Sequence, residues 1–367
     1  MASPSTEGAR LTRREALART GSILGAGALA LGRGAPVAAA RPKARLGITG
    51  GTQPVWRYLA ARKAELLEGP LGYDLEFRIF PSDAAMRIVF LAGDLEGFTT
   101  LIPEAPALIE QKVDVQFFLP IAWVRETGVF AVRRESGIKS LAEARGRKIA
   151  TSPLRQAGLA YFRAFVLANH GFKLEEHMDL LQVNTPDVPL EAGQSDGAYI
   201  SSVHWVRLKD SGKYVRITSL GDEWARISQS PRLLAFGGVL ARRKWIEENR
   251  KLVEGLIGAA AEAQRHLGRN RAEFLEIVRN YDADGSIKKQ TPEQAAFSIW
   301  SFGHEDVGPE RVHLTRQDVE DFRLVFSLLE KSGYLKAPPP AETIFYLSQP
   351  RSGHRLPPAR EGGSHLS

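Results

Sequence analysis

Short apolar runs alternate with segments of helical periodicity along most of the chain. Runs such as ARLGIT and YDLEFRIF have the length and composition of strands. The segments about 54–67 and 83–91 that follow them carry apolar residues at helical spacing. The same order recurs from GRKIATS through LLQVN and GAYIS to YVRITSL. Strands interleaved with helices predict an α/β fold in which parallel sheets are covered on both faces.

The repetition of this order predicts two αβ lobes in one chain. WVRETGVFAVRRES and, later, SPRLLAFGGVLARR read as extended segments that run from the first lobe to the second and back. We therefore expect a two-segment hinge with a cleft between the lobes, the first lobe taking residues 41–126 and 240–336 and the second 127–239. Long helices are predicted over about 245–267, 271–281, 292–302 and 316–332, and residues 337–367 form a tail rich in Pro and Gly.

The first forty residues are typical of an export signal. The adjacent Arg13 and Arg14 follow Thr12, a mildly apolar Gly/Ala-rich run spans 21–32, and AAA stands at 38–40 as a small-residue cleavage site. The apolar run is shorter than the roughly 20 residues needed to cross a bilayer. We expect a twin-arginine-type signal peptide over 1–40 and a mature protein released into the periplasm.

Composition narrows the possible chemistry. The chain of 367 residues has no cysteine, which excludes disulfides, thiolate metal sites, cysteine nucleophiles and a lipid-anchoring cysteine. The formal net charge is +7, and five Arg and two Glu lie in residues 1–40, which leaves +4 on the rest. Basic and acidic residues are interspersed, so a nucleic-acid partner is not expected. Single histidines such as His204 and His266 lack partners at metal-ligand spacing, so we expect no metal site.

One motif suggests a hydrolase. Gly193 to Gly197 read G-x-S-x-G, the pattern of a nucleophile elbow with Ser195 as nucleophile. Such an elbow needs a strand before the serine and a helix after it. Here the segment before Ser195 is helix-like and AYIS after it is strand-like. We interpret the motif as a loop and keep an exported serine hydrolase using Ser195 as the less favoured alternative.

Two loops that join a strand to a helix are candidates for binding an anion. GITGGTQPVW contains Gly50, Gly51 and Thr52, with Trp56 in the helix that follows. KIATSPLRQAG contains Thr151, Ser152 and Arg155 at the start of its helix. Backbone N–H groups at a helix N-terminus favour an anion or an acceptor oxygen. Ordinary turns and surface caps are the alternative reading of both loops.

Two hydroxyl pairs occupy matching positions. LAGDLEGFTT ends in Thr99 and Thr100, and EAGQSDGAYISS ends in Ser201 and Ser202. A strand carries each pair to its carboxyl end, the edge of an open sheet at which ligands bind. Capping of the helices that follow is the alternative, and it is compatible with ligand contact.

Taken in order, these motifs resemble the exported solute-binding proteins of ABC transporters, in the branch that handles nitrate, taurine, alkanesulfonates and thiamine-precursor pyrimidines. The resemblance rests on GVFAVRRESGIKSLAEARGRKIATS, on the two hydroxyl-pair segments, on GITGGTQP and on RRKWIEENRKLVEGLIGAAAEAQRHL, and it covers about 44–334. It implies a type II periplasmic-binding-protein fold, no catalysis and no cofactor. It also implies a monomer that delivers its solute to an ABC permease and ATPase.

Carried over by position, the resemblance implies a cleft lined by both loops and both hydroxyl pairs. Arg155 would bind a carboxylate or sulfonate, so a sulfonate, taurine-like or other small anionic solute is our first expectation. Asp222 and Glu223 would accept the amine of a zwitterion, or form only a solvated loop. Tryptophans near predicted loops would stack on a planar or pyrimidine-like solute, or pack in the core: Trp56, Trp123, Trp205 and Trp224. At SSVHW the sequence departs from the family pattern, which leaves the ligand class open.

Overall fold

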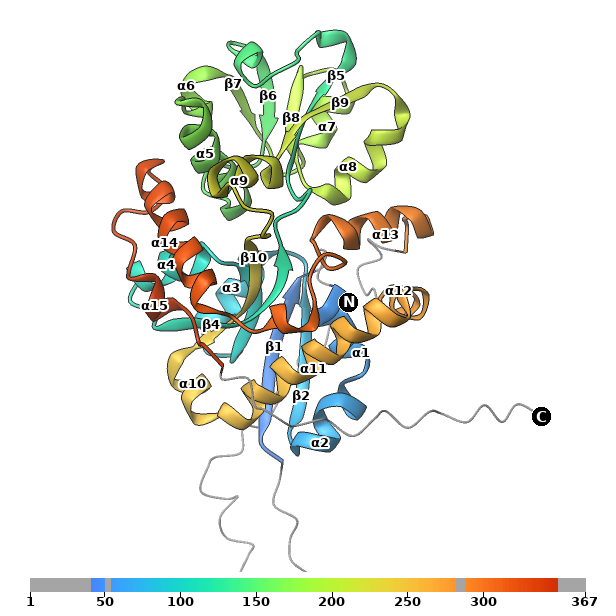
Figure 1. Cartoon of the computed structure of the whole chain (residues 1–367), viewed down its shortest axis with the longest axis vertical. Helices are drawn as coiled ribbons and strands as arrows, with labels where there is room; N and C mark the ends of the chain where they lie inside the picture. Colours follow the sequence, from blue (N-terminus) through green and yellow to red (C-terminus); the bar gives the residue numbers. More distant parts are fainter. Residues whose placement is uncertain (1–40, 50–53, 282–287, 349–367) are drawn as a thin grey trace, which may run out of the picture. The chain divides into compact units, whose positions relative to one another are not determined.

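The computed structural model describes residues 41–49, 54–281 and 288–348, and in these ranges the chain forms two five-stranded sheets with helices around them (Figure 1). The first sheet has the spatial order β2-β1-β3-β10-β4. Its strands are β1 (Lys43–Thr49), β2 (Asp74–Phe80), β3 (Gly97–Leu101), β4 (Val115–Trp123) and β10 (Ala235–Arg242). The expected signal peptide, the Gly50 to Thr52 loop and the end of the tail from 349 lie outside the described residues.

The second sheet is built from the middle of the chain. Its order is β7-β6-β8-β5-β9. Its strands are β5 (Val129–Arg133), β6 (Lys148–Thr151), β7 (Asp179–Gln182), β8 (Gly197–Ile200) and β9 (Tyr214–Ser219). The expected α/β fold with two lobes is confirmed.

Both sheets are mixed, where the sequence pattern predicted parallel ones. In the first sheet β1 pairs parallel with β2 and β3, but β10 runs antiparallel to β3 and to β4. In the second sheet β5 runs antiparallel to β8 and β9. These two antiparallel strands follow the links that carry the chain from one sheet to the other. Each therefore enters its sheet in the opposite direction to the strands joined by local helical crossovers.

The helices that flank the first sheet come from both ends of the described chain. They are α1 (Pro54–Ala61), α2 (Gly69–Leu71), α3 (Asp83–Leu91), α4 (Glu104–Glu110), α10 (Arg243–Glu248), α11 (Arg250–Arg269), α12 (Arg271–Asn280), α14 (Arg316–Lys331) and α15 (Ala341–Ile344). A π-helical turn, η1 (Ala64–Glu68), continues α1, and a 3-10 turn, η5 (Pro309–Val312), precedes α14. The helix expected at about 245–267 is divided at Asn249 between α10 and α11.

The helices of the second sheet are mostly short. They are α5 (Ala157–His170), α6 (Leu174–His177), α7 (Asp187–Glu191), α8 (Ser202–Leu208) and α9 (Leu220–Ser228), with 3-10 turns η2 (Arg134–Ser136), η3 (Ala142–Ala144) and η4 (Lys209–Ser211). Two later helices also pack here, because α13 (Pro292–Ser301) contacts α8 and α14 contacts α5.

The links between the sheets lie side by side and are hydrogen-bonded. The N–H of Val124 donates to the main-chain oxygen of Leu234 at 2.8 Å, which joins the outgoing link to the returning one. The last residue of α13 is hydrogen-bonded to the outgoing link. Ser301 accepts from the N–H of Glu126 at 3.1 Å and from the Thr127 hydroxyl at 2.8 Å through its main-chain oxygen.

Local sequence signals explain several helix ends. Ser219 and Asp222 form a capping box at the start of α9, and Thr315 and Asp318 form another at the start of α14. Gly171, with φ of +74°, ends α5 in the left-handed conformation that glycine adopts without steric cost. Within the described residues, no helix is both long and apolar enough to cross a membrane.

Candidate functional site

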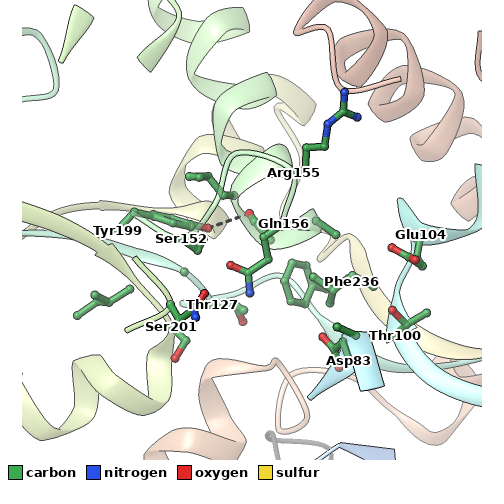
Figure 2. A pocket seen from close by; sticks show the side chains of 18 of the residues that line it. Asp83, Thr100, Glu104, Thr127, Ser152, Arg155, Gln156, Tyr199, Ser201 and Phe236 are labelled. Atoms are coloured by element: carbon green, nitrogen blue, oxygen red, sulfur yellow. Dashed lines mark hydrogen bonds between the residues drawn. The ribbon is translucent and has the colours of Figure 1, made fainter. Parts of the chain in front are cut away.

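A cavity of about 630 Å³ is lined by residues from both sheets (Figure 2). The first sheet contributes residues at the carboxyl end of β3 and the start of β10, together with the first turns of α3 and α4. The second sheet contributes the end of β8 and the N-terminal ends of α5 and α8. Strand ends and helix starts meet at this position, as in open α/β sheets that bind ligands at their carboxyl edges.

Aromatic side chains form much of the apolar wall. Phe98, Tyr199, Phe236 and Phe302 line the cavity, and each is less than a tenth exposed. Tyr199 stacks on Phe162, with ring centroids 4.3 Å apart, and burial raises the pKa of its hydroxyl. Rings held in this way offer a rigid apolar surface to the organic body of a ligand.

The N-terminus of α5 faces the cavity. Gln156, Ala157 and Gly158 line it, and Figure 2 shows the Gln156 side chain extending into it. Within the described residues the backbone N–H groups of Ala157, Gly158 and Leu159 have no acceptor, and the Gln156 side chain forms no cap. Three free donors at the positive end of a 14-residue helix dipole suit an anion.

Two hydroxyls add further donors beside α5. Ser152 and Ser201 line the cavity, and neither side chain forms a hydrogen bond within the described part of the chain. Ser201 precedes α8, and its hydroxyl does not cap that helix. Both hydroxyls are therefore free to contact a ligand.

Two of the charged side chains on the first-sheet side of the cavity form an ion pair with each other. Arg87 on α3 and Glu104 on α4 both line the cavity, and their side chains are 2.8 Å apart. Asp83, at the start of α3, is solvent-accessible. Desolvation of its carboxyl raises the pKa, and a hydrogen bond from Thr49 only partly offsets this rise. Arg155, across the cavity, is exposed and forms no ion pair within the described chain.

A histidine is held at the second-sheet side of the cavity. His204 on α8 lines the wall, and its Nδ1 lies 3.3 Å from Oδ1 of the buried Asp187. Arg207 pairs with the other oxygen of Asp187 at 2.8 Å. No group of three or more His, Asp or Glu side chains in the described ranges is placed to hold a metal ion.

The structure brings four of the sequence-predicted site residues to the cavity: Thr100, Ser152, Arg155 and Ser201. They come from β3, from the loop before α5 and from the residue before α8. In each hydroxyl pair, one member lines the wall and its neighbour does not. In the loop before α5, Ser152 and Arg155 line the wall and Thr151 does not.

Four other predicted residues lie in the protein interior: Trp56, Thr99, Thr151 and Ser202. Trp56 is fully buried against Phe77, with ring centroids 5.3 Å apart, and is a core residue. The three hydroxyl residues are at most 1% exposed, and none lines the cavity. Gly50, Gly51 and Thr52 lie outside the described residues.

The remaining tryptophans and the proposed amine acceptors are structural. Trp123, Trp205 and Trp224 are buried and do not line the cavity. Asp222 belongs to the capping box of α9. Glu223 is fully buried and accepts hydrogen bonds from Asn169 at 2.7 Å and Thr218 at 2.6 Å. None of these residues lines this cavity, and the packing alternative describes the tryptophans.

The G-x-S-x-G serine is placed as the order of elements predicted. Ser195 lies directly before β8, at the strand end opposite the one that reaches the cavity, and no helix follows it. The residue is 2% exposed and its hydroxyl has no hydrogen-bond partner in the described chain. These features exclude a nucleophile elbow at Ser195.

Sequence reasoning missed several polar wall residues. Asp83, Arg87 and Glu104 come from helices, and Gln156, Asn184 and His204 from helix starts and a loop. Asp83 and Arg87 are four residues apart and so share a helix face, which is the one signal that grouped them. Which face of this helix lines the cavity depends on its packing against elements that are distant in the sequence.

Comparison with known proteins agrees with this architecture. Residues 121–269 match the family model described as NMT1/THI5 like. By sequence, no curated protein matches the chain.

Solved structures of binding proteins share the fold. The alkanesulfonate-binding protein SsuA from Xanthomonas axonopodis pv. citri, bound to MOPS, has a TM-score of 0.62 at 16% identity, over 84% of this chain and 99% of its own. The periplasmic aliphatic sulphonate binding protein SsuA from Escherichia coli has a TM-score of 0.63 at 16% identity, over 88% and 98%. A ligand binding component of an ABC-type import system from Staphylococcus aureus has a TM-score of 0.62 at 11% identity, over 84% and 97%.

The family resemblance drawn from the sequence motifs is confirmed by the family model and by these neighbours. The chain has the two-lobe fold of the periplasmic binding proteins, with an NMT1/THI5-like segment over residues 121–269.

Proposed function

We propose that the protein is the solute-binding receptor of an ABC importer and captures a small organic anion, such as a sulfonate, in the cavity between its sheets. The carrying observation is the uncapped N-terminus of α5, which presents free N–H donors to the cavity beside Arg155 and Ser152. Charge-assisted hydrogen bonds from such groups bind sulfonate or carboxylate oxygens.

The aromatic part of the cavity wall favours an organic solute over a bare inorganic anion. Phe98, Phe236 and Phe302 line a space of about 630 Å³, within the size range typical of small-molecule sites. An apolar or aromatic body attached to the anionic group would bury these faces. The same wall supports a second candidate, a planar aromatic or pyrimidine-like solute that stacks without an anionic group.

The proposed receptor role also implies a cellular location and protein partners. The signal-like residues 1–40 support export to the periplasm, and the absence of cysteine argues against a lipid anchor. The partners would be the permease and ATPase of a membrane importer, as the description of the S. aureus neighbour suggests for that protein. The protein would act as a monomer, without a cofactor and without turning over its solute.

A thermal-shift screen against sulfonates, carboxylates, nitrate and pyrimidines tests the proposal. A true ligand stabilises the folded state by about 2.7 kcal/mol at a hundredfold excess over Kd. For an anionic ligand, Arg155→Ala should abolish most of that stabilisation. Arg250→Ala, which removes an exposed arginine outside the cavity, should leave it unchanged.

The outcomes separate the candidates. Stabilisation by pyrimidines alone, unaffected by Arg155→Ala, would replace the anion by the planar solute. If the pure protein consumed a compound with steady turnover, the proposal that it is a binding receptor would be wrong.

A further inference from the structure

His204 is a cavity residue with one ring nitrogen held by the protein and the other free. It belongs to the SSVHW segment, at which the sequence departs from the family pattern, and it lines the cavity from α8. Its Nδ1 lies 3.3 Å from Oδ1 of Asp187, which does not line the cavity. Nε2 forms no hydrogen bond or ion pair within the described residues. The ring nitrogen left for a ligand is therefore Nε2.

The surroundings of Asp187 determine which ring nitrogen carries the proton. Asp187 is 6% exposed, and its second oxygen pairs with Arg207 at 2.8 Å. Apart from the contact with Nδ1, Oδ1 has no hydrogen-bond partner within the described part of the chain. A carboxylate only accepts hydrogen bonds, and two facing lone pairs would repel each other. Chemistry therefore places the proton of the neutral ring on Nδ1 and leaves a lone pair on Nε2.

Neutral His204 differs from the polar groups beside it because its free nitrogen can only accept. The hydroxyl and amide side chains on the same side of the cavity both donate and accept, and so adapt to either kind of ligand group: Ser152, Gln156, Asn184 and Ser201. A lone pair whose position is fixed by Asp187 cannot exchange roles in this way. It penalises a ligand that brings an oxygen lone pair to the same place.

We propose that His204 is a specificity-determining residue whose Nε2 accepts a hydrogen bond from an N–H or O–H group on the organic body of the solute. The inference rests on the proposed function, because it assigns a further contact of the same solute. It holds whatever charge the rest of the solute carries. Protonation of the ring turns Nε2 into a donor, so acidification exchanges the kind of group that binds there.

Other charged groups surround the imidazole. Asp187, Glu191 and Arg207 lie on α7 and α8. The elements that contact α8 carry Arg133 on β5, Lys209 and Asp210 on η4, and Glu293 on α13. Arg87, Glu104, Arg155 and Asp83 line other parts of the cavity. Histidine is the side chain whose charge ordinarily changes between pH 5 and 8. Because desolvation raises the pKa of Asp83, a variant without the imidazole must serve as the reference for any pH effect.

A pair of planar probes tests the contact. Indole-3-acetate and benzofuran-3-acetate have the same charge and nearly the same shape, but one has a ring N–H donor where the other has a ring oxygen. Isothermal titration calorimetry on the mature chain at pH 8 should give about fivefold tighter binding of the indole compound, the effect of one net hydrogen bond. At pH 5.5 the preference should fall below about twofold or reverse, because the ring gains its second proton.

Two substitutions separate the ring from its carboxylate partner. His204→Phe keeps a ring but removes Nε2, so the indole preference and its pH dependence should both disappear. In Asp187→Asn the amide oxygen stays with Arg207 and the amide N–H faces Nδ1, which moves the proton of the neutral ring to Nε2. This variant should favour the benzofuran compound at pH 8. Asp74→Asn makes the same charge change at an exposed carboxylate outside the cavity and should keep the wild-type preference.

The tautomer can be read without any ligand. Nitrogen–proton correlation NMR of the imidazole rings identifies His204 by the signals that are missing from His204→Phe. At pH 8 these signals should report Nδ1–H in wild type and Nε2–H in Asp187→Asn. Thermal melts without ligand check that each variant is folded.

Every outcome decides the question. An Nε2–H tautomer in wild type, equal binding of the two probes at pH 8, or an indole preference that survives His204→Phe overturns the role of His204 while the receptor stands. Failure of both probes to bind wild type counts against the organic-anion receptor as well as the His204 contact.

Discussion

The hydroxyl of Tyr199 donates a hydrogen bond to the main-chain oxygen of Gly158, 3.3 Å away (Figure 2). Tyr199 belongs to β8 and Gly158 to the first turn of α5, and both residues line the cavity. The contact ties the helix start that offers its N–H donors to the strand that ends beside them. A donor group in a binding site is effective only when its support is rigid.

Replacing Tyr199 by Phe removes this hydrogen bond and keeps the stacking on Phe162. We expect a loss of about 1 kcal/mol in the free energy of unfolding, the usual net value of one buried hydrogen bond. Urea denaturation measures it. Tyr214→Phe is the control, because the Tyr214 hydroxyl has no hydrogen-bond partner in the described chain and should change stability by less than about 0.5 kcal/mol. Equal effects of both variants would contradict this role of Tyr199.

Gly128 in the outgoing link has a φ of +69°, and an added Cβ would stand 2.0 Å from the Tyr199 hydroxyl. Gly128→Ala therefore combines left-handed backbone strain with a steric clash. We expect it to lower the free energy of unfolding by more than about 2 kcal/mol. Gly137→Ala has a similar φ of +73° and open space around its Cβ, so it isolates the backbone cost of about 1 kcal/mol. If the two variants are equally stable, the clash with the Tyr199 hydroxyl does not contribute to the loss of stability in Gly128→Ala.

His304 should make stability depend on pH. It is 1% exposed, packs edge-on against Trp123 at 5.5 Å, and burial lowers the pKa of its ring to about 3. The unfolded chain binds the proton near the ordinary pKa of 6.5. The stabilising contribution of neutral His304 is therefore fully present above pH 6.5 and is lost as the pH falls toward 3.

The measurement is the free energy of unfolding of wild type and His304→Phe between pH 4 and 8. Below pH 6.5 wild type should lose up to about 1.4 kcal/mol per pH unit more than the variant. Above pH 7 the two curves should run parallel. Parallel curves over the whole range would show that His304 does not titrate on unfolding.

Ser195→Ala should preserve ligand binding, because Ser195 is remote from the cavity wall. Its hydroxyl is buried without a hydrogen-bond partner in the described residues, so its removal should leave stability unchanged or raise it slightly. Calorimetry with a confirmed ligand and a thermal melt check both points. Labelling of Ser195 by a serine-directed fluorophosphonate would contradict the placement.

The sequence allowed the elements to be predicted where local signals were strong. The helix expected at 83–91 is found at Asp83–Leu91, since Ser82 supplies the cap and the apolar residues keep helical spacing. The helix expected at 245–267 is split, because Asn249 departs from helical geometry with φ of −118° and its side chain donates to the main-chain oxygen of Trp245. An asparagine within a periodic segment was the available signal.

The cavity wall was harder to predict than the sheets. Thr99 and Thr100 are neighbours on one strand, so their side chains point to opposite faces, and only one can reach the cavity. Both faces of that strand are buried, which removes the polar alternation that would have chosen between them. Asp83 and Arg155 line the same cavity only because of the path of the two links that connect the sheets. No local sequence pattern predicts that path.

The position of α13 limits how the protein can be divided. Phe297 of this helix packs on the core of the second sheet beside Trp205 and Leu208 of α8, although the helix follows the last strand of the first sheet by about fifty residues. A fragment cut at the two links would expose these apolar side chains to water. The halves are therefore not exchangeable modules, and a substitution in α13 changes the packing of the second sheet.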